Sequence, residues 1–142
     1  MTRTMPEPVW MQEKSGPRVL IEESDYAKQV ALERILRERG YAVLGCGGPE
    51  ATDDRCALVE NHECGAVEGA DVVVHALRSH DPRNREVLRS IRERYPDTPV
   101  VVEAPRPLVE REPADFDGCI VVYQPVTADS LVAAVESALG DA

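Results

Sequence analysis

Short continuous apolar runs alternate along this chain with stretches whose apolar residues recur at helical spacing. Residues 70–77 read Ala-Asp-Val-Val-Val-His-Ala-Leu. A run of β-branched residues of this length is typical of a strand that is buried on both faces. Similar runs at residues 18–21, 100–103 and 119–123, with a further one at 41–45, predict four more strands around it.

Between these runs, apolar residues three and four positions apart predict helices over residues 26–39 and 126–139, with another that begins at Pro82 after the N-cap Asp81. Residues 53–60 are expected to form a short helix, and three prolines make 106–115 a poor one. Strands that alternate with helices predict an α/β fold. We expect a doubly wound, five-stranded parallel sheet in a flavodoxin-like, three-layer α/β/α arrangement.

The amino-terminal residues carry no such periodicity. Residues 1–17 hold three prolines among mixed charges, which predicts a flexible tail before an α/β domain over 18–142. Trp10 could dock on the domain or on a partner. Because no core pattern begins before Arg18, we expect removal of residues 1–15 to leave stability nearly unchanged.

Composition and charge narrow the classes of function. Only 4% of the chain is aromatic against 43% hydrophobic residues, so the core must be aliphatic. A formal net charge of -10 repels phosphates, which argues against binding to nucleic acid or to an anionic membrane. No apolar run is long enough to span a membrane, and no signal peptide is evident, so we expect a cytoplasmic protein with reduced cysteines.

The order and spacing of several segments resemble the receiver domain of two-component response regulators. Residues 18–25 resemble its first strand and acidic turn, and 39–43 resemble the link into its second strand. Residues 70–77 resemble its phosphoacceptor strand. Residues 95–102 and 122–131 resemble the fourth strand and the fifth strand with its helix, so that the likeness covers roughly 18–139.

The resemblance implies a phosphorylation site, but its functional positions carry other residues here. In the family, an aspartate at the end of the central strand accepts a phosphoryl group, an acidic pair holds Mg²⁺, and a hydroxyl and a lysine contact the phosphoryl group. These positions fall on Ala76, on Glu23 and Ser24, on Ala104, and on Gln124. Glu23 alone keeps its chemical type, and one carboxylate is a poor Mg²⁺ site. We therefore expect a pseudo-receiver that is not phosphorylated.

No other catalytic constellation is evident, so the chain is not expected to be an enzyme. His75 beside Ala76 is expected to be a structural histidine rather than an alternative phosphoacceptor. No glycine-rich phosphate loop follows the first strand, and the sequence places no Ser/His/Asp or Cys/His set together.

The segment between the second and third strands is longer than receivers need and contains Cys46, Cys56, His62 and Cys64. Thiolate and imidazole groups suit zinc or an iron–sulfur cluster, but the spacing matches no tight metal-binding pattern. A thiol redox pair is a further possibility. The simplest alternative is that these cysteines are small buried residues, as expected for Cys119.

The resulting hypothesis is a phosphorylation-independent signalling module that acts on a protein partner or on a second copy of itself and needs no cofactor. The surface that receivers use for output corresponds to residues 106–112, Tyr123 and 126–139. The alternative function is a metal or thiol sensor that uses Cys46, Cys56, His62 and Cys64.

Overall fold

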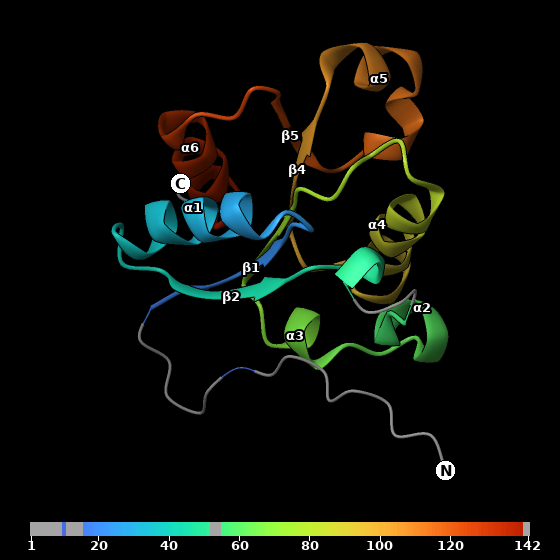
Figure 1. Ribbon diagram of the computed structural model, residues 1–142, viewed down its shortest axis with the longest axis horizontal. Helices are drawn as coiled ribbons and strands as arrows, with labels where there is room; N and C mark the ends of the chain where they lie inside the picture. The colour runs from blue at the N-terminus through green and yellow to red at the C-terminus, as the bar shows by residue number, and fades with distance from the viewer. Residues whose placement is uncertain (1–9, 11–15, 52–54, 141–142) are drawn as a thin grey trace.

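The computed structural model describes residues 10, 16–51 and 55–140. Five parallel strands form one sheet in the order β2-β1-β3-β4-β5, which confirms the predicted doubly wound fold (Figure 1). The strands are β1 (Arg18–Glu22), β2 (Ala42–Cys46), β3 (Val72–His75), β4 (Val100–Ala104) and β5 (Ile120–Tyr123). The central position of β3 explains why both of its faces are apolar.

Helices cover both faces of the sheet. Two long helices, α1 (Tyr26–Arg37) and α6 (Ala128–Ala138), lie side by side on one face. The other face carries the long helix α4 (Pro82–Arg94) and a set of shorter ones. These are η1 (Pro49–Ala51), α2 (Ala57–Asn61), α3 (Gly65–Glu68), α5 (Arg106–Arg111) and η2 (Pro113–Phe116).

Each face has its own aliphatic core because successive strand residues point to opposite sides. Val72, Val74 and Ala76 pack with the α1/α6 layer. Val73 and Leu77 pack on the opposite side with residues of α2, α3 and α4. The same alternation places the side chains of His75 and Ala76, at the end of β3, on opposite faces of the sheet.

Local capping fixes where the long helices begin. The Asp25 carboxylate accepts a hydrogen bond from the Lys28 amide at 3.2 Å, and Asp81 accepts one from Arg83 at 2.9 Å. Thr127 and Ser130 form a reciprocal capping box at the start of α6. The helices expected over residues 26–39 and 126–139 are slightly shorter, since α1 ends at Arg37 and α6 begins after Thr127.

Two crossovers differ from expectation. The segment expected to be a poor helix forms α5 and η2, because Pro107 and Pro113 occupy first turns, where a missing N–H costs little. The short helix expected at 53–60 lies at Ala57–Asn61, and residues 52–54 are outside the described part. No helix was expected where α3 forms a single turn after Cys64.

Trp10 docks on the domain, which is one of the two alternatives that the sequence left open. Its indole Nε1 donates a hydrogen bond of 2.7 Å to the Ala66 carbonyl of α3, and its ring packs against one of the two cores. The Arg18 guanidinium lies 5.6 Å from the ring centroid. A Cβ atom on Gly69 would come within 2.4 Å of the indole, so glycine makes room for this contact. The other residues of the expected tail, 1–9 and 11–15, lie outside the described part.

None of the helices in the described ranges has the length and apolar character needed to cross a membrane.

The Trp10 contact predicts an effect on stability. Replacing Trp10 with alanine is expected to lower the free energy of unfolding by about 1–2 kcal/mol, because apolar burial and one hydrogen bond are lost. Trp10→Phe is the matched control, since it keeps most of the ring contact and loses the N–H donor. Urea unfolding measures both variants. Equal stability of the alanine variant and the parent would show that the indole contact contributes nothing.

Candidate functional site

The carboxyl ends of the parallel strands bring together the positions that the sequence singled out. Glu23 follows β1, Ala76 follows β3, Ala104 ends β4, and Gln124 follows β5 at a cis bond to Pro125. Glu103, which the sequence analysis did not single out, adds a second carboxylate at this edge. Its position just before Ala104 on an otherwise apolar strand is the signal that could have revealed it.

Lys28 of α1 supplies the positive charge among these carboxylates. Its Nζ lies 2.6 Å from Glu103 Oε1 and 3.9 Å from Glu23 Oε1. Glu103 and Glu23 are only 4% and 5% exposed, and buried carboxylates need a counter-charge or a proton. Asp25 caps the first turn of α1 and thereby positions Lys28, three residues on, over the end of the sheet. Gln124 Nε2 reaches Glu103 Oε1 only at 3.5 Å.

Lys28 lies closer to Glu103 than to Glu23, and the pKa of Glu23 is shifted. Burial raises the pKa of Glu23 to about 7, with Glu103 adding to the rise and Lys28 opposing it. Near neutral pH the site therefore holds the Lys28–Glu103 ion pair beside a Glu23 that exchanges its proton.

Two of the positions that the resemblance assigns to phosphoryl chemistry carry alanine. Ala76 is 4% exposed, and its amide donates a 2.8 Å hydrogen bond to the Glu22 carbonyl. Ala104 is fully buried, and its carbonyl accepts a 3.2 Å bond from the Gln124 amide. Ser24 is half-buried in the bend after β1. The edge thus has a charge network and no carboxylate at the phosphoacceptor position.

Sequence reasoning missed a buried polar pair on the opposite face. His75 Nδ1 lies 2.7 Å from Glu22 Oε1, and the two residues are 1% and 4% exposed. They are register partners on β1 and β3. Each precedes a residue that the resemblance had singled out, so strand alternation turns their side chains away from Lys28.

The four residues of the cysteine segment come from different local elements. Cys56 and Cys64 stand at the N-cap positions of α2 and α3, and exposed His62 ends α2 in a left-handed conformation. Cys46 ends β2. Within residues 10, 16–51 and 55–140, no three His, Cys, Asp or Glu side chains converge as a metal site.

Burial also changes the acidity of three of the thiols. Burial raises the pKa of Cys46 to about 12 and, in the same direction, those of Cys56 and Cys119. Thiolate is the reactive and metal-binding form, so these sulfurs are poorly reactive at neutral pH. Their contacts with the core around Leu58 and Val67 favour the structural interpretation.

Comparison with solved structures identifies the architecture. A response-regulator receiver domain protein from Clostridium thermocellum is similar over 87% of this chain and 94% of its own, with 20% identity and a TM-score of 0.64. A response-regulator receiver protein from Sinorhizobium medicae is similar over 89% of this chain and 96% of its own, with 19% identity and a TM-score of 0.65. The chemotaxis response regulator CheY4 of Vibrio cholerae is similar over 88% of this chain and 100% of its own, with 16% identity and a TM-score of 0.66. The fold is that of a receiver domain.

The likeness is confined to three-dimensional structure. No family model matches this sequence, and no curated protein matches it either. At these identities the shared receiver fold places strand ends and helices, while the side chains at the strand ends are this chain's own.

The acidity of Glu23 predicts a pH dependence of stability. The folded pKa of about 7 exceeds the ordinary value of 4.5, so the folded state binds more protons between these pH values. Stability from this group is fully present below pH 4.5 and is lost as the pH rises through 7. Relative to Glu23→Gln, the parent should therefore lose about 2 kcal/mol between pH 5 and pH 8.

Urea unfolding of both proteins at the two pH values measures this difference, and Glu38→Gln at an exposed position of the same chain is the control. A stability difference between parent and Glu23→Gln that stays constant with pH would show that the Glu23 carboxyl has an ordinary pKa.

Proposed function

We propose that this chain is a phosphorylation-independent regulatory module that acts through contact with a protein partner or with a second copy of itself. One observation carries the proposal. Ala76 occupies the phosphoacceptor position of a receiver fold, while Lys28 already neutralises Glu103 at the strand ends. A receiver responds to a phosphoryl group on an aspartate at this edge, whereas residue 76 of this chain has no carboxylate to accept one.

The contact surface is proposed from the fold and from one exposed aromatic residue. Tyr123 at the end of β5 is 36% exposed, and the Arg106 guanidinium stacks 3.9 Å from its ring centroid. Aromatic and arginine side chains are the residue types that most often dominate protein interfaces. Arg106 begins α5 and Tyr123 ends β5, the last strand before α6, so the proposed face comprises residues 106–112, Tyr123 and 126–139.

The first experiment tests chemical silence. Incubation with acetyl phosphate and Mg²⁺ should leave the intact mass unchanged, because no carboxylate stands at position 76. Ala76→Asp should restore little modification, since Gln124 and Ala104 still lack the charge and the hydroxyl that would stabilise a phosphoryl group. An added phosphoryl mass on the folded parent would refute the proposal.

A second experiment tests the contact surface. A photo-crosslinking residue at Tyr123 should give a defined adduct in cells, with the same yield in the presence or absence of acetyl phosphate. With an aromatic crosslinking residue such as benzoylphenylalanine at position 123, Arg106→Ala should reduce the yield about two- to fivefold, because a guanidinium on an exposed ring contributes about 0.5–1 kcal/mol. The same residue placed at exposed Glu38 on α1 is the control. Equal adducts from positions 38 and 123 would contradict a specific interface on this face.

A further inference from the structure

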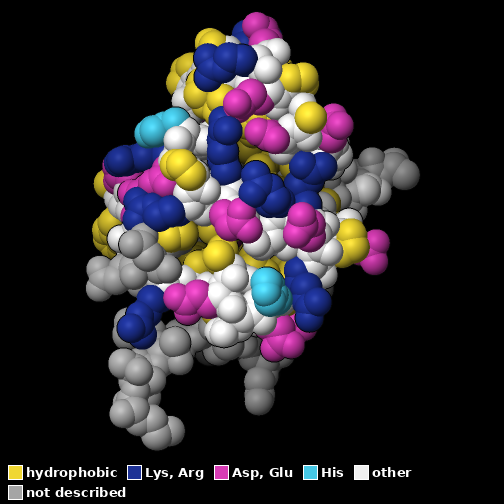
Figure 2. Space-filling view, turned by 90° about the vertical axis from the view of Figure 1, so that its right-hand side faces the viewer, with side chains coloured by type: hydrophobic (Ala, Val, Ile, Leu, Met, Phe, Trp, Pro, Cys, Tyr) yellow, Lys and Arg dark blue, Asp and Glu magenta, His cyan; other side chains and the backbone are white. Residues whose placement is uncertain are grey.

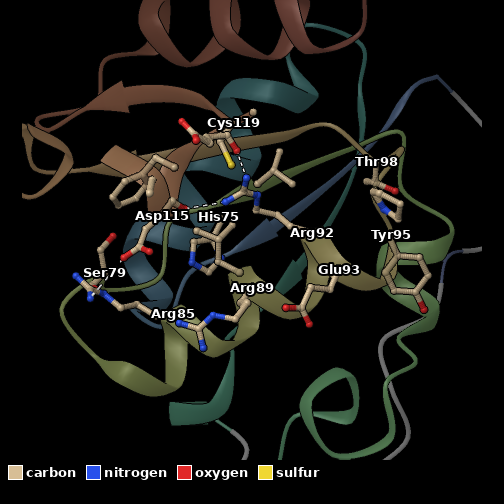
Figure 3. Close-up of a pocket in the computed structure, with 17 residues that line it drawn as sticks. His75, Ser79, Arg85, Arg89, Arg92, Glu93, Tyr95, Thr98, Asp115 and Cys119 are labelled. Carbon is tan, nitrogen blue, oxygen red and sulfur yellow. Dashed lines mark hydrogen bonds and ion pairs between the residues drawn. The ribbon is translucent and has the colours of Figure 1, made fainter. Parts of the chain in front are cut away.

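A cavity of about 580 Å³ lies between α4 and the η2 segment, on the face opposite the Lys28 site (Figure 3). Its volume falls within the range of small-molecule sites in proteins. The wall combines α4 with the strand ends and the loop that leads from η2 into β5. Its charged and polar lining residues include His75, Ser79, Arg85, Arg89, Arg92 and Asp115.

The floor of this cavity contains the buried histidine. His75 is 1% exposed and lines the cavity, while Glu22 engages its Nδ1 from behind at 2.7 Å. A carboxylate beside Nδ1 fixes the orientation of the imidazole ring. Nε2 is then the ring nitrogen that a bound molecule would meet. A histidine backed by a buried carboxylate is a costly feature for an aliphatic core to hold.

Three arginines of α4 surround the cavity, although the chain as a whole is strongly acidic. Arg85, Arg89 and Arg92 follow one another at spacings of four and three, which places them along one side of the helix. Figure 2 shows dark blue basic side chains gathered over the middle of this face, with carboxylates among them. In the close-up, the three arginine side chains lie around that of His75.

The present partners of the arginines are groups of the protein itself. Arg85 pairs with Glu112 and lies 3.8 Å from Asp115, and Arg89 pairs with Glu86 at 2.6 Å. Arg92 donates to the carbonyls of Asp115 and Asp117, which ties α4 to the η2 segment. The exposed carboxylates hold the positions on the guanidinium groups that an incoming anion would take.

The rest of the wall mixes apolar and polar side chains. Leu88, Val100 and Phe116 give it an apolar part, and Cys119 with its burial-raised pKa contributes a neutral sulfur. Glu93, Tyr95, Thr98 and Asp117 also line it. A fully hydrated inorganic ion would gain nothing from the apolar part, whereas a molecule with a hydrocarbon or aromatic body would bury apolar area.

We propose that this cavity binds a small organic anion, with its carboxylate or phosphate group held by Arg85 and Arg89 next to the His75 imidazole. Its apolar body lies against Leu88 and Phe116. The proposal is independent of the function proposed above, because β3 turns His75 and Ala76 toward opposite faces of the sheet.

Isothermal titration calorimetry of the full chain tests the proposal with four probes: phenyl phosphate, benzoate, inorganic phosphate and acetate. One or both aromatic anions should bind saturably, and each should bind more tightly than its counterpart without a ring. The comparison of phenyl phosphate with benzoate tells which anionic group the site prefers. Imidazole resonances of His75, followed by NMR, should shift during the same titration.

Arg89→Met removes an exposed guanidinium from the cavity wall without disturbing the core, and it should weaken binding about tenfold or more. Arg94→Met, on the same helix outside the cavity, is the matched control and should bind within about twofold of the parent. Absence of saturable binding by both aromatic anions at about 10 mM would overturn the proposal. Equal losses in the two variants, or binding that leaves the His75 resonances unmoved, would overturn it as well.

Discussion

The ion pair between Lys28 and Glu103 is the interaction on which the carboxyl edge of this sheet depends. A parallel sheet collects its strand ends at one edge, and here that edge contains three nearly inaccessible carboxyl groups, those of Glu22, Glu23 and Glu103. A buried carboxylate without compensation would destabilise the fold or remain protonated. One ammonium group from α1 compensates Glu103, and partial protonation accommodates Glu23. Glu22, the third of these groups, lies 2.7 Å from His75 Nδ1 on the opposite face of the sheet.

Strand alternation separates two distinct polar sites that adjoin each other in the sequence. Glu22 and Glu23 are consecutive, as are His75 and Ala76, but their side chains belong to opposite layers. One layer holds the lysine network beside α1, and the other holds the buried histidine at the floor of the arginine-lined cavity. A change at one site can therefore be examined with little direct disturbance of the other.

The fold could be predicted from the sequence because its signals are local and repeated. Runs such as Val72–His75 and caps such as Thr127 each specify one element, and their alternation specifies the sheet. The positions of Glu23, Ala76, Ala104 and Gln124 at a common edge follow from the same pattern. The Lys28–Glu103 pair could not be found this way, since it joins residues 75 positions apart through the angle at which α1 crosses the sheet.

The cysteine segment shows the opposite case, in which residue type alone could not predict where the side chains lie. Cys46, Cys56, His62 and Cys64 carry suitable donor atoms, but the single turns α2 and α3 direct the cysteines toward the core and leave His62 exposed. The extra length of this crossover instead provides the Ala66 carbonyl and the space at Gly69 that receive Trp10. A contact with residue 10 depends on the path of a chain segment that has no periodicity, so no pattern in the sequence could reveal it.

Titration of the protein with Mg²⁺, followed through the side-chain carboxyl resonances of Glu23 and Glu103, tests the central claim most directly. If Lys28 already supplies the counter-charge, neither resonance should show a saturable shift at millimolar Mg²⁺. Lys28→Ala is the companion measurement, because it removes that charge and should increase the response. Saturable binding of Mg²⁺ by the parent protein at Glu23 and Glu103 would contradict the account.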